Sequence, residues 1–248
     1  MPETIVGRNP VIEALKAGRA IEHISLLSGV HGKPIEEIRA LAKTRNIPVT
    51  EMHRQKFREL ADDQMTQGVV AVLRSPHKYV GVESLFGIAA GRNQKPFLLI
   101  LDEIEDPHNL GALVRTAECA GVHGVIVPKH HSAPVNSTVV KTSAGATTHI
   151  AIAEVTNIVH TIRDLKQEGC WIVGLDGAGD RLHDAVDYTS PIVLVVGNEG
   201  KGIRRLVKEH CDFLVRIPLL GRIESLNASV AGAIAMYEVV RQRTKREN

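Results

Sequence analysis

The sequence predicts an α/β protein in two parts, a small alternating α/β unit at the N-terminus and a larger domain built on a parallel β-sheet. From Pro96 onward, short runs in which nearly every residue is apolar alternate with amphipathic segments. Strands that are apolar on both faces are typical of a parallel sheet covered by helices on both sides. Before residue 76 the apolar runs are fewer and alternate with helix-like segments. The 248 residues, 44% of them hydrophobic, are enough for two cores.

In the first part, residues 1–75, Asn9-Pro10 predicts a helix start with Asn9 as the N-cap, and Gly18 offers the stop. A second helix is expected from Pro34, and residues 53–62 are expected to be helical. Three strands are expected, at Ile24–Leu27, Ile47–Thr50 and Val69–Leu73.

Residues 76–95 are expected to form a linker, because proline and glycine interrupt the apolar pattern there. One short helix, at 83–90, is expected within it. The domain boundaries predicted from the sequence are therefore 1–75, 76–95 and 96–248.

In the second part, six apolar runs predict the strands of the parallel sheet, and apolar stripes at helical spacing lie between them. A last helix is expected to run from just after Asn227 to about Arg241. The six runs are Phe97–Leu101, Val122–Val127, Ile150–Ala153, Trp171–Leu175, Ile192–Val196 and Phe213–Ile217. Ligands of open parallel sheets bind beyond the carboxyl ends of the strands, so the residues that follow each run are the candidates for function.

The first such segment, residues 102–116, combines Asn109, Gly111 and Arg115. Asn109 is a possible helix cap, and Gly111 permits close approach of a ligand or of another backbone. The guanidinium of Arg115 is a fixed fork of donors that suits phosphate. An ordinary helix start with a surface arginine remains the alternative interpretation, and the four carboxylates of this loop are expected to be solvated.

The second segment, residues 197–202, carries three glycines directly after a buried strand. Such glycines allow positive φ and bring amide groups next to a ligand. The segment matches neither a Walker A loop nor G-x-G-x-x-G. A nucleotide-like ligand and a merely tight turn both remain open, and Lys201 is expected to be a solvated lysine.

The third segment begins at Ile217 and places Ser225 and Asn227 just before the last helix. Either side chain is a possible helix cap, which is the usual role of serine and asparagine in this position. The glycine-rich turn at 176–180 follows another strand and is expected to line the same crevice.

Together these segments resemble the three motifs of the SpoU (TrmH-like) family in the SPOUT superfamily of methyltransferases. The resemblance rests on N-x-G-x-x-x-R at 109–115, on the apolar strand that leads into Gly197-Asn198-Glu199-Gly200, and on I-P-L-x-G-x-x-x-S-L-N-x-S-V-A from Ile217. It covers roughly residues 96–243 and is closest to the RlmB-like enzymes, which methylate a guanosine ribose in 23S ribosomal RNA. It implies a small N-terminal α/β/α RNA-binding domain and a C-terminal SPOUT domain with a trefoil knot.

The resemblance further implies RNA 2′-O-ribose methylation with S-adenosylmethionine as methyl donor, by a homodimer in which Arg115 serves either its own donor pocket or the partner's. The donor contacts that it implies are Gly197, Ile217, Leu226, Leu175, Gly177 and Pro218. The catalytic group that it implies is Arg115, with Asn109, Glu199, Ser225 and Asn227 ordering the site.

Charge adds little to this interpretation, because the formal net charge is only +2. The RNA contacts are expected in the first domain, at Arg39, Lys43, Arg45, Arg54, Lys56 and Arg58. Three widely spaced cysteines and the lack of a signal-peptide pattern or a long apolar run favour a cytoplasmic protein without a membrane span. The histidines, His108, His123, His130 and His131 among them, fit no metal-ligand spacing, so no metal is expected.

Three alternatives remain open. A transfer-RNA 2′-O-methyltransferase would share the catalytic motifs. A catalytically inactive RNA-binding factor of ribosome assembly would keep the fold. A nicotinamide-dependent oxidoreductase would use the glycine-rich loop for a dinucleotide, although the ordered fingerprint of that class is missing.

Overall fold

The computed structural model describes residues 4–58, 66–73 and 77–244, and the chain divides into two compact units, one ending at Pro76 and the other beginning at His77. Residues 59–62 of the expected helix lie outside the described residues. The α/β class predicted from the sequence is confirmed, and each unit has its own hydrophobic core.

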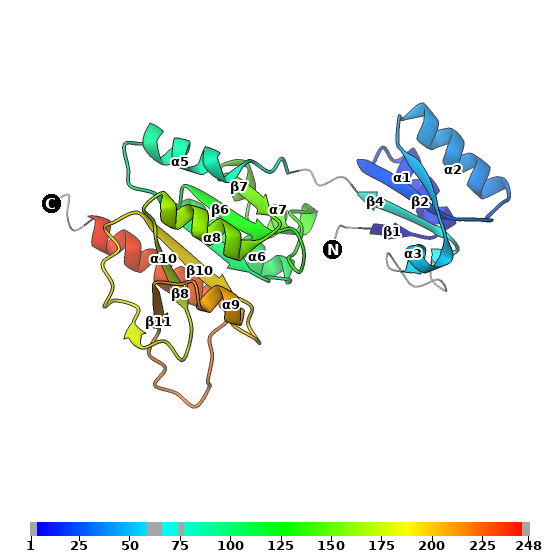
Figure 1. The fold of residues 1–248 in the computed structure, drawn as a ribbon. Coiled ribbons are helices and arrows are strands. Elements are labelled where there is room, and N and C mark those ends of the chain that lie inside the picture. Colours follow the sequence, from blue (N-terminus) through cyan, green and yellow to red (C-terminus); the bar gives the residue numbers. More distant parts are fainter. Residues whose placement is uncertain (1–3, 59–65, 74–76, 245–248) are drawn as a thin grey trace. The chain divides into compact units, whose positions relative to one another are not determined.

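In its described residues, the first unit is a four-stranded mixed sheet of order β1-β4-β2-β3 with three helices (Figure 1). Strands β2 and β3 are parallel, and the other two pairs are antiparallel. The core joins Val11 and Leu15 of the first helix to Ile24 of β2 and Ile38 of the second helix, all of them fully or almost fully buried. The elements are β1 (Thr4–Val6), α1 (Arg8–Lys16), β2 (Ile21–Leu27), α2 (Lys33–Thr44), β3 (Val49–Met52), α3 (Arg54–Arg58) and β4 (Val69–Leu73).

Two details of this unit differ from the sequence expectation. Helix α1 begins at Arg8 with Gly7 at the N-cap, so Asn9 lies inside the helix and caps nothing. Gly7 has φ of 95°, a conformation that glycine adopts without strain. Strand β1 was not expected, because three residues carry too little pattern to predict a strand; it pairs with β4.

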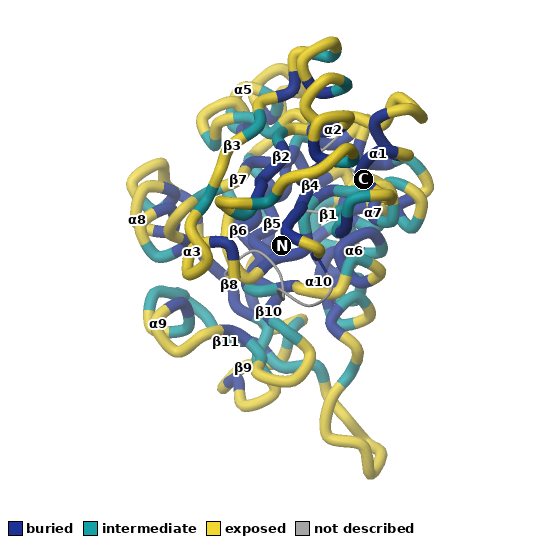
Figure 2. Tube along the Cα trace, turned by 90° about the vertical axis from the view of Figure 1, so that its right-hand side faces the viewer, coloured by how far each residue is buried: buried dark blue, intermediate teal, exposed yellow. Residues whose placement is uncertain are grey.

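The second unit has a seven-stranded sheet of order β7-β6-β5-β10-β8-β11-β9, and every pair in it is parallel, as the sequence predicted. Figure 2 shows the central strands as buried. The strands are β5 (Phe97–Asp102), β6 (Gly124–Pro128), β7 (Ile152–Val155), β8 (Trp171–Leu175), β9 (Arg181–Leu182), β10 (Ile192–Gly197) and β11 (Phe213–Arg216).

Helices cover both faces of this sheet. On one face α6 and α10 pack against Leu194 and Val196 of β10, and on the other face α5, α8 and α9 pack against Val193 and Val195. The alternation along β10 explains why every residue of the strand is apolar. The helices are α5 (Val82–Gly91), α6 (Pro107–Cys119), α7 (Ser137–Thr142), the 3₁₀ turn Ala146–Thr148, α8 (Ile158–Gln167), α9 (Arg205–Lys208) and α10 (Ala228–Thr244).

The segment expected to be a linker, residues 76–95, contributes α5 to the core of the second unit. Leu85 of α5 is fully buried, and a Cβ on Gly124 would lie 2.4 Å from a methyl carbon of Leu85. Val80 also forms a parallel bridge with Ala153. The segment from residue 77 is therefore packed against the sheet.

The buried histidine of this unit makes stability depend on pH. His123 is 1% exposed; its Nδ1 accepts a hydrogen bond from the Phe97 amide (3.0 Å), so Nε2–H donates to Gln94 Oε1 (3.0 Å). Burial, helped by the charges of Arg92 and Arg243, lowers the pKa of His123 to about 4. The imidazole is thus neutral in the folded state and holds the start of β5.

We expect the free energy of unfolding to fall as the pH drops from about 6.5 to about 4, because the unfolded state takes up the proton first. This group contributes up to about 3 kcal/mol of that loss. Urea unfolding of the protein and of His123→Gln over this range measures the effect, with the exposed His149→Gln as control. A His123→Gln variant with an unchanged pH slope would contradict the assignment.

Candidate functional site

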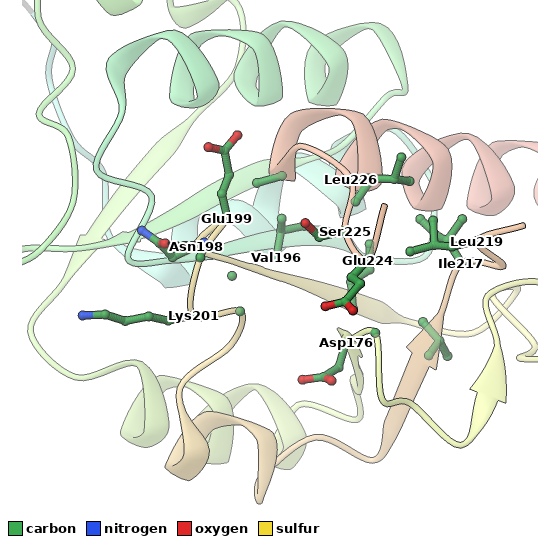
Figure 3. A pocket seen from close by; sticks show the side chains of 18 of the residues that line it. Asp176, Val196, Asn198, Glu199, Lys201, Ile217, Leu219, Glu224, Ser225 and Leu226 are labelled. Carbon is green, nitrogen blue, oxygen red and sulfur yellow. Dashed lines mark hydrogen bonds between the residues drawn. The ribbon is translucent and has the colours of Figure 1, made fainter. Parts of the chain in front are cut away.

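The carboxyl ends of β8, β10 and β11 open into a cavity of about 280 Å³. Figure 3 shows its wall as three loops that meet around one opening: Asn198, Glu199 and Lys201 after β10, Glu224, Ser225 and Leu226 before α10, and Asp176 after β8. The place is the one expected for a ligand of an open parallel sheet.

Gly197, the last residue of β10, lies against the backbone of the loop that it begins. A Cβ at this position would come within 2.2 Å of the Gly202 carbonyl carbon. The amide of Asn198 donates to Gly202 O (3.1 Å), and the amide of Gly202 donates to Asn198 O (2.8 Å), while Gly202 has φ of 66°. The loop is therefore a tight turn, and it also lines the cavity, so a nucleotide-like ligand beside it stays a prediction.

A buried ion pair anchors the far end of this loop. Asp102, the last residue of β5, is fully buried and accepts hydrogen bonds from the Arg204 amide (2.9 Å) and from Arg204 Nε (2.8 Å). Asn198 Nδ2 donates to Glu103 O (3.0 Å). The expectation that Asp102 is solvated is therefore wrong. Its partner, Arg204, lies 102 residues later in the chain, in the loop after the neighbouring strand β10, so the local sequence does not reveal the pair.

Three polar side chains, one from each sequence motif, form a single cluster. Asn109 Nδ2 donates to Glu199 Oε1 (2.8 Å), and Asn227 Nδ2 donates to Asn109 Oδ1 (3.0 Å) and to Glu199 Oε1. Asn109 is 8% exposed. Glu199 lines the cavity, so the cluster forms part of one rim of the cavity. The convergence of the three motifs, which the sequence could only suggest, is present within one chain.

The N-cap of α6 is a different residue from the one that the sequence offered, Asn109. Asp106 is the N-cap of α6, where its Oδ1 accepts from the His108 amide (3.0 Å), so Asn109 lies in the first turn and is available to the cluster. Asn227 caps α10 through its Oδ1, which accepts from the Ser229 amide (2.9 Å). Asn227 thus serves both the helix and the cluster.

The space where Gly111 lacks a side chain is occupied by a residue of another helix. A Cβ there would lie 1.9 Å from Thr142 Oγ1 of α7, and this hydroxyl donates to the Pro107 carbonyl (3.3 Å). The close approach that the sequence predicted at Gly111 is therefore made by α7.

Arg115 stands apart from the cavity of its own chain. It lies on the exposed face of α6 and is absent from the cavity lining. Within the described residues, its guanidinium makes no hydrogen bond or ion pair. Ser225, by contrast, lines the cavity directly.

Five of the six residues expected to contact a methyl donor line the cavity, and Pro218 is exposed and does not. The half-buried side chains of Ile217 and Leu226 offer an apolar surface, and Gly197 lines the same cavity. An apolar slot with backbone amides and carbonyls at its edge fits an adenine base. The five are Leu175, Gly177, Gly197, Ile217 and Leu226.

Sequence reasoning missed an ion pair in the cavity wall. Lys208 Nζ of α9 pairs with Asp176 Oδ2, and Asp176 Oδ1 accepts from the Ala178 amide (2.9 Å). Burial alone would raise the pKa of Asp176, but the hydrogen bonds and the charge of Lys208 outweigh it and lower the pKa. Glu224 is a further lining residue that the sequence did not single out. Asp176 sits in the glycine-rich turn noted above, whereas no sequence signal marks Lys208.

The basic residues expected to contact RNA in the first unit have different surroundings. Arg45 donates to the carbonyl oxygens of Leu15 (2.8 Å) and Arg19 (2.9 Å), so it ties α2 to the end of α1. Arg39 forms an ion pair with Glu51. The remaining candidates are exposed: Lys43, Arg54, Lys56 and Arg58.

The described residues contain neither a metal-binding cluster nor a membrane span. No group of three or more histidine, cysteine, aspartate or glutamate side chains there is arranged to hold a metal ion. No helix in the described ranges is both long and apolar enough to cross a membrane.

A wholly parallel sheet with a glycine-lined cavity at its carboxyl edge is the arrangement with which the class of open α/β proteins binds its ligands. Residues 96–237 match the SpoU rRNA methylase family, and residues 4–79 match the family described as RNA 2′-O ribose methyltransferase substrate binding. The chain belongs to the SpoU family, and it is an S-adenosylmethionine-dependent RNA 2′-O-methyltransferase. Because the chain belongs to this family, the alternative of a nicotinamide-dependent oxidoreductase is excluded.

Relatives match nearly the whole chain. It is 41% identical over 239 residues to the putative TrmH family tRNA/rRNA methyltransferase YacO of Bacillus subtilis, covering 96% of this chain and 95% of that protein. It is 43% identical over 229 residues to the 23S rRNA (guanosine-2′-O-)-methyltransferase RlmB of Pseudomonas aeruginosa, covering 92% of each. The crystal structure of the SpoU methyltransferase AviRb from Streptomyces viridochromogenes in complex with AdoMet superimposes with a TM-score of 0.61 at 25% identity, covering 98% and 90% of the two chains.

Proposed function

We propose that this methyltransferase modifies the ribose of a guanosine in 23S ribosomal RNA, and that it does so in the cytoplasm, where that RNA is found. The observation that carries the activity is the Asn109–Glu199–Asn227 cluster on the rim of the cavity. The choice of RNA and base is supported by the relative from Pseudomonas aeruginosa, whose name specifies both.

The cavity is where S-adenosylmethionine would bind, with Ile217 and Leu226 against the adenine and the backbone at Gly197 and Leu175 along its polar edge. When bound, this donor supplies an electrophilic methyl group. A ribose 2′-hydroxyl is a weak nucleophile, so the chain must orient it and stabilise the charge that develops as its proton leaves.

The polar cluster performs the orienting step. Glu199 Oε1 accepts from both Asn109 and Asn227, so its position is fixed before any substrate arrives. Ser225 lines the cavity two residues before Asn227 and presents a hydroxyl to the nucleotide. Side chains that are held in place in advance lower the entropy cost of aligning the reacting groups.

Arg115 acts across a homodimer, in the donor pocket of the partner subunit. Its exposed position outside the cavity of its own chain supports this role. A guanidinium stays charged at ordinary pH, so it clamps the phosphate beside the target ribose and stabilises developing alkoxide charge instead of taking the proton.

The apolar surface beside the cavity supports the dimer. The loop between β11 and α10, which extends from the sheet in Figure 1, exposes Leu220 by 99% and Ile223 by 76%, and Val230 in the first turn of α10 is 47% exposed. Large exposed apolar side chains that gather in one region mark an interface. The small residues of α10 serve another purpose, because Gly232 lies against Leu113 and Val196 of the same chain.

The trefoil knot implied by the family resemblance is also part of this proposal. The strand order places β11 beyond β8, after which the chain returns to pack α10 on β10 and α6. This return of the C-terminal segment from an outer strand to an inner one supports a knotted terminus.

Transfer of labelled methyl from S-adenosylmethionine to unmodified RNA tests the proposal. We expect 23S ribosomal RNA from a strain that lacks the modification to accept one methyl per molecule, on a guanosine ribose, and transfer RNA to accept none. Methylation of transfer RNA alone would replace the proposed substrate by the one that the TrmH-type names of other relatives allow. A folded protein that binds the donor and labels neither RNA would be a non-catalytic binding factor.

A further inference from the structure

The loop that follows β6 carries three consecutive side chains suited to phosphate: Lys129, His130 and His131. All three are exposed, and within the described part of the chain none of their side chains has a hydrogen-bonding or ionic partner. The function derived above assigns them no role. Consecutive exposed donors without a counter-ion form a surface for an anion.

This loop is held in one conformation. The Lys129 amide donates to Val155 O (2.8 Å), and the Ala133 amide donates to Ile104 O (2.8 Å). His131 lies between these anchors with φ of 57°, a left-handed conformation that non-glycine residues adopt only when their surroundings fix it. The lysine and the two imidazole side chains therefore start from fixed backbone positions, as they must to place a ligand.

The loop lies at the same edge of the sheet as the loop that carries Glu199. Strand β6 pairs with β5, and β5 pairs with β10, in a parallel sheet whose carboxyl ends share one edge. Neighbouring strands lie about 4.8 Å apart, so the loop after β6 begins about 10 Å from the loop after β10 that carries Glu199. Its anchor, Ile104, belongs to the same connection that leads to Asn109.

Two further donor side chains are exposed on α6 and α7, the helices before and after β6 in the chain. His108 lies in the first turn of α6. Lys141 of α7 is exposed and precedes Thr142, which packs on Gly111 of α6. Glu105 and Asp106 follow Ile104, which anchors the loop, and Asp106 is occupied as the cap of α6.

We propose that the Lys129–His131 loop binds backbone phosphates of the RNA strand next to the target ribose, so that the second unit holds its own segment of RNA. The inference rests on the RNA methyltransferase function. An RNA strand fits better than a protein partner, because the three residues offer only polar donors and no exposed apolar side chain. Phosphate contacts set the register of the strand, and the cavity and cluster then act on one ribose.

The test compares the triple variant Lys129→Gln/His130→Gln/His131→Gln and the single variant Lys129→Gln with Lys95→Gln. Lys95 is an exposed lysine two residues before the start of β5, at the opposite edge of the same sheet, and serves as the matched control. Binding of an unmodified 23S ribosomal RNA transcript is measured over a range of salt concentrations, together with S-adenosylmethionine affinity and the KM for RNA.

We expect the triple variant to bind the transcript about tenfold more weakly, with a correspondingly higher KM and unchanged donor affinity. The slope of log affinity against log salt should become shallower by about 0.7 for each phosphate that the variant no longer binds. RNA affinity and a salt slope equal to those of Lys95→Gln would overturn the proposal. Failure of the methylation function itself would appear separately, as absence of transfer by the unmodified protein, and the binding comparison would remain decisive.

Discussion

Replacement of Arg115 by alanine is expected to abolish methyl transfer and to leave the affinity for S-adenosylmethionine within about twofold of the original. The first expectation follows from its proposed role, because removing one donor that stabilises developing negative charge costs about a hundredfold to a thousandfold in rate, and here a phosphate clamp is removed as well. The second follows from the same role, because the guanidinium is proposed to contact the RNA phosphate and the developing alkoxide, and not the donor. Single-turnover transfer and calorimetric titration of the donor measure the two quantities.

The variant Arg115→Lys tests whether the positive charge is sufficient or whether the planar guanidinium is required. Arg115→Lys keeps the positive charge but loses the fork of donors that binds phosphate in two places, so its rate should remain far below the original. Arg205, with a side chain 80% exposed on α9, provides the matched control, and Arg205→Ala should transfer methyl normally. Near-normal turnover by Arg115→Lys would contradict the clamp.

Subunit mixing tests whether Arg115 acts in the partner's site. Arg115→Ala and Leu226→Trp, which fills the apolar side of the cavity, are each expected to be inactive. After random exchange of equal amounts, mixed dimers that share sites across the interface contain one intact site, so about one quarter of the activity should return. If Arg115 acts within its own chain, mixing restores nothing.

The strands of the second unit could be predicted from sequence because both of their faces are covered by helices. Ile192–Val196 is apolar throughout, and the structure buries all of β10. Elements that bury little or are very short left no such signal, as with the two exposed residues of β9 and the six residues of α7. The order of the strands also lies beyond local pattern, since β10 inserts between β5 and β8 through contacts distant in the chain.

The candidate site, too, could be predicted from local sequence only in part. Residue types and strand-end positions were enough to select Asn109, Glu199 and Asn227, and the family resemblance gave them roles. Their hydrogen bonds join positions 90 and 118 residues apart, which depend on the strand order and on the return of the chain to α10. Asp102 illustrates the limit of local pattern, because a loop of carboxylates predicts solvation, whereas the ion pair with Arg204 buries this one completely.

Gly197→Ala is expected to lower both stability and donor affinity by large amounts. The added methyl would meet the backbone of Gly202 and Ile203 at 2.2 to 2.4 Å, and that backbone cannot yield easily because the Asn198–Gly202 pair and the Arg204–Asp102 ion pair hold it. Overpacking of this kind costs about 1–3 kcal/mol or more, and any relief must displace the cavity wall. Thermal unfolding with and without S-adenosylmethionine measures both effects.

Gly200→Ala makes the same chemical change in the same loop and serves as the control. Its Cβ would meet only Asn198 Oδ1, at 3.7 Å, so its unfolding temperature should stay close to that of the original. The comparison isolates the close approach at Gly197 from the general loss of glycine flexibility, which would stabilise either variant slightly. Equal unfolding temperatures and equal donor-induced shifts for the two variants would show that the loop after β10 adapts to the methyl group, and that its packing against Gly197 does not shape the donor pocket.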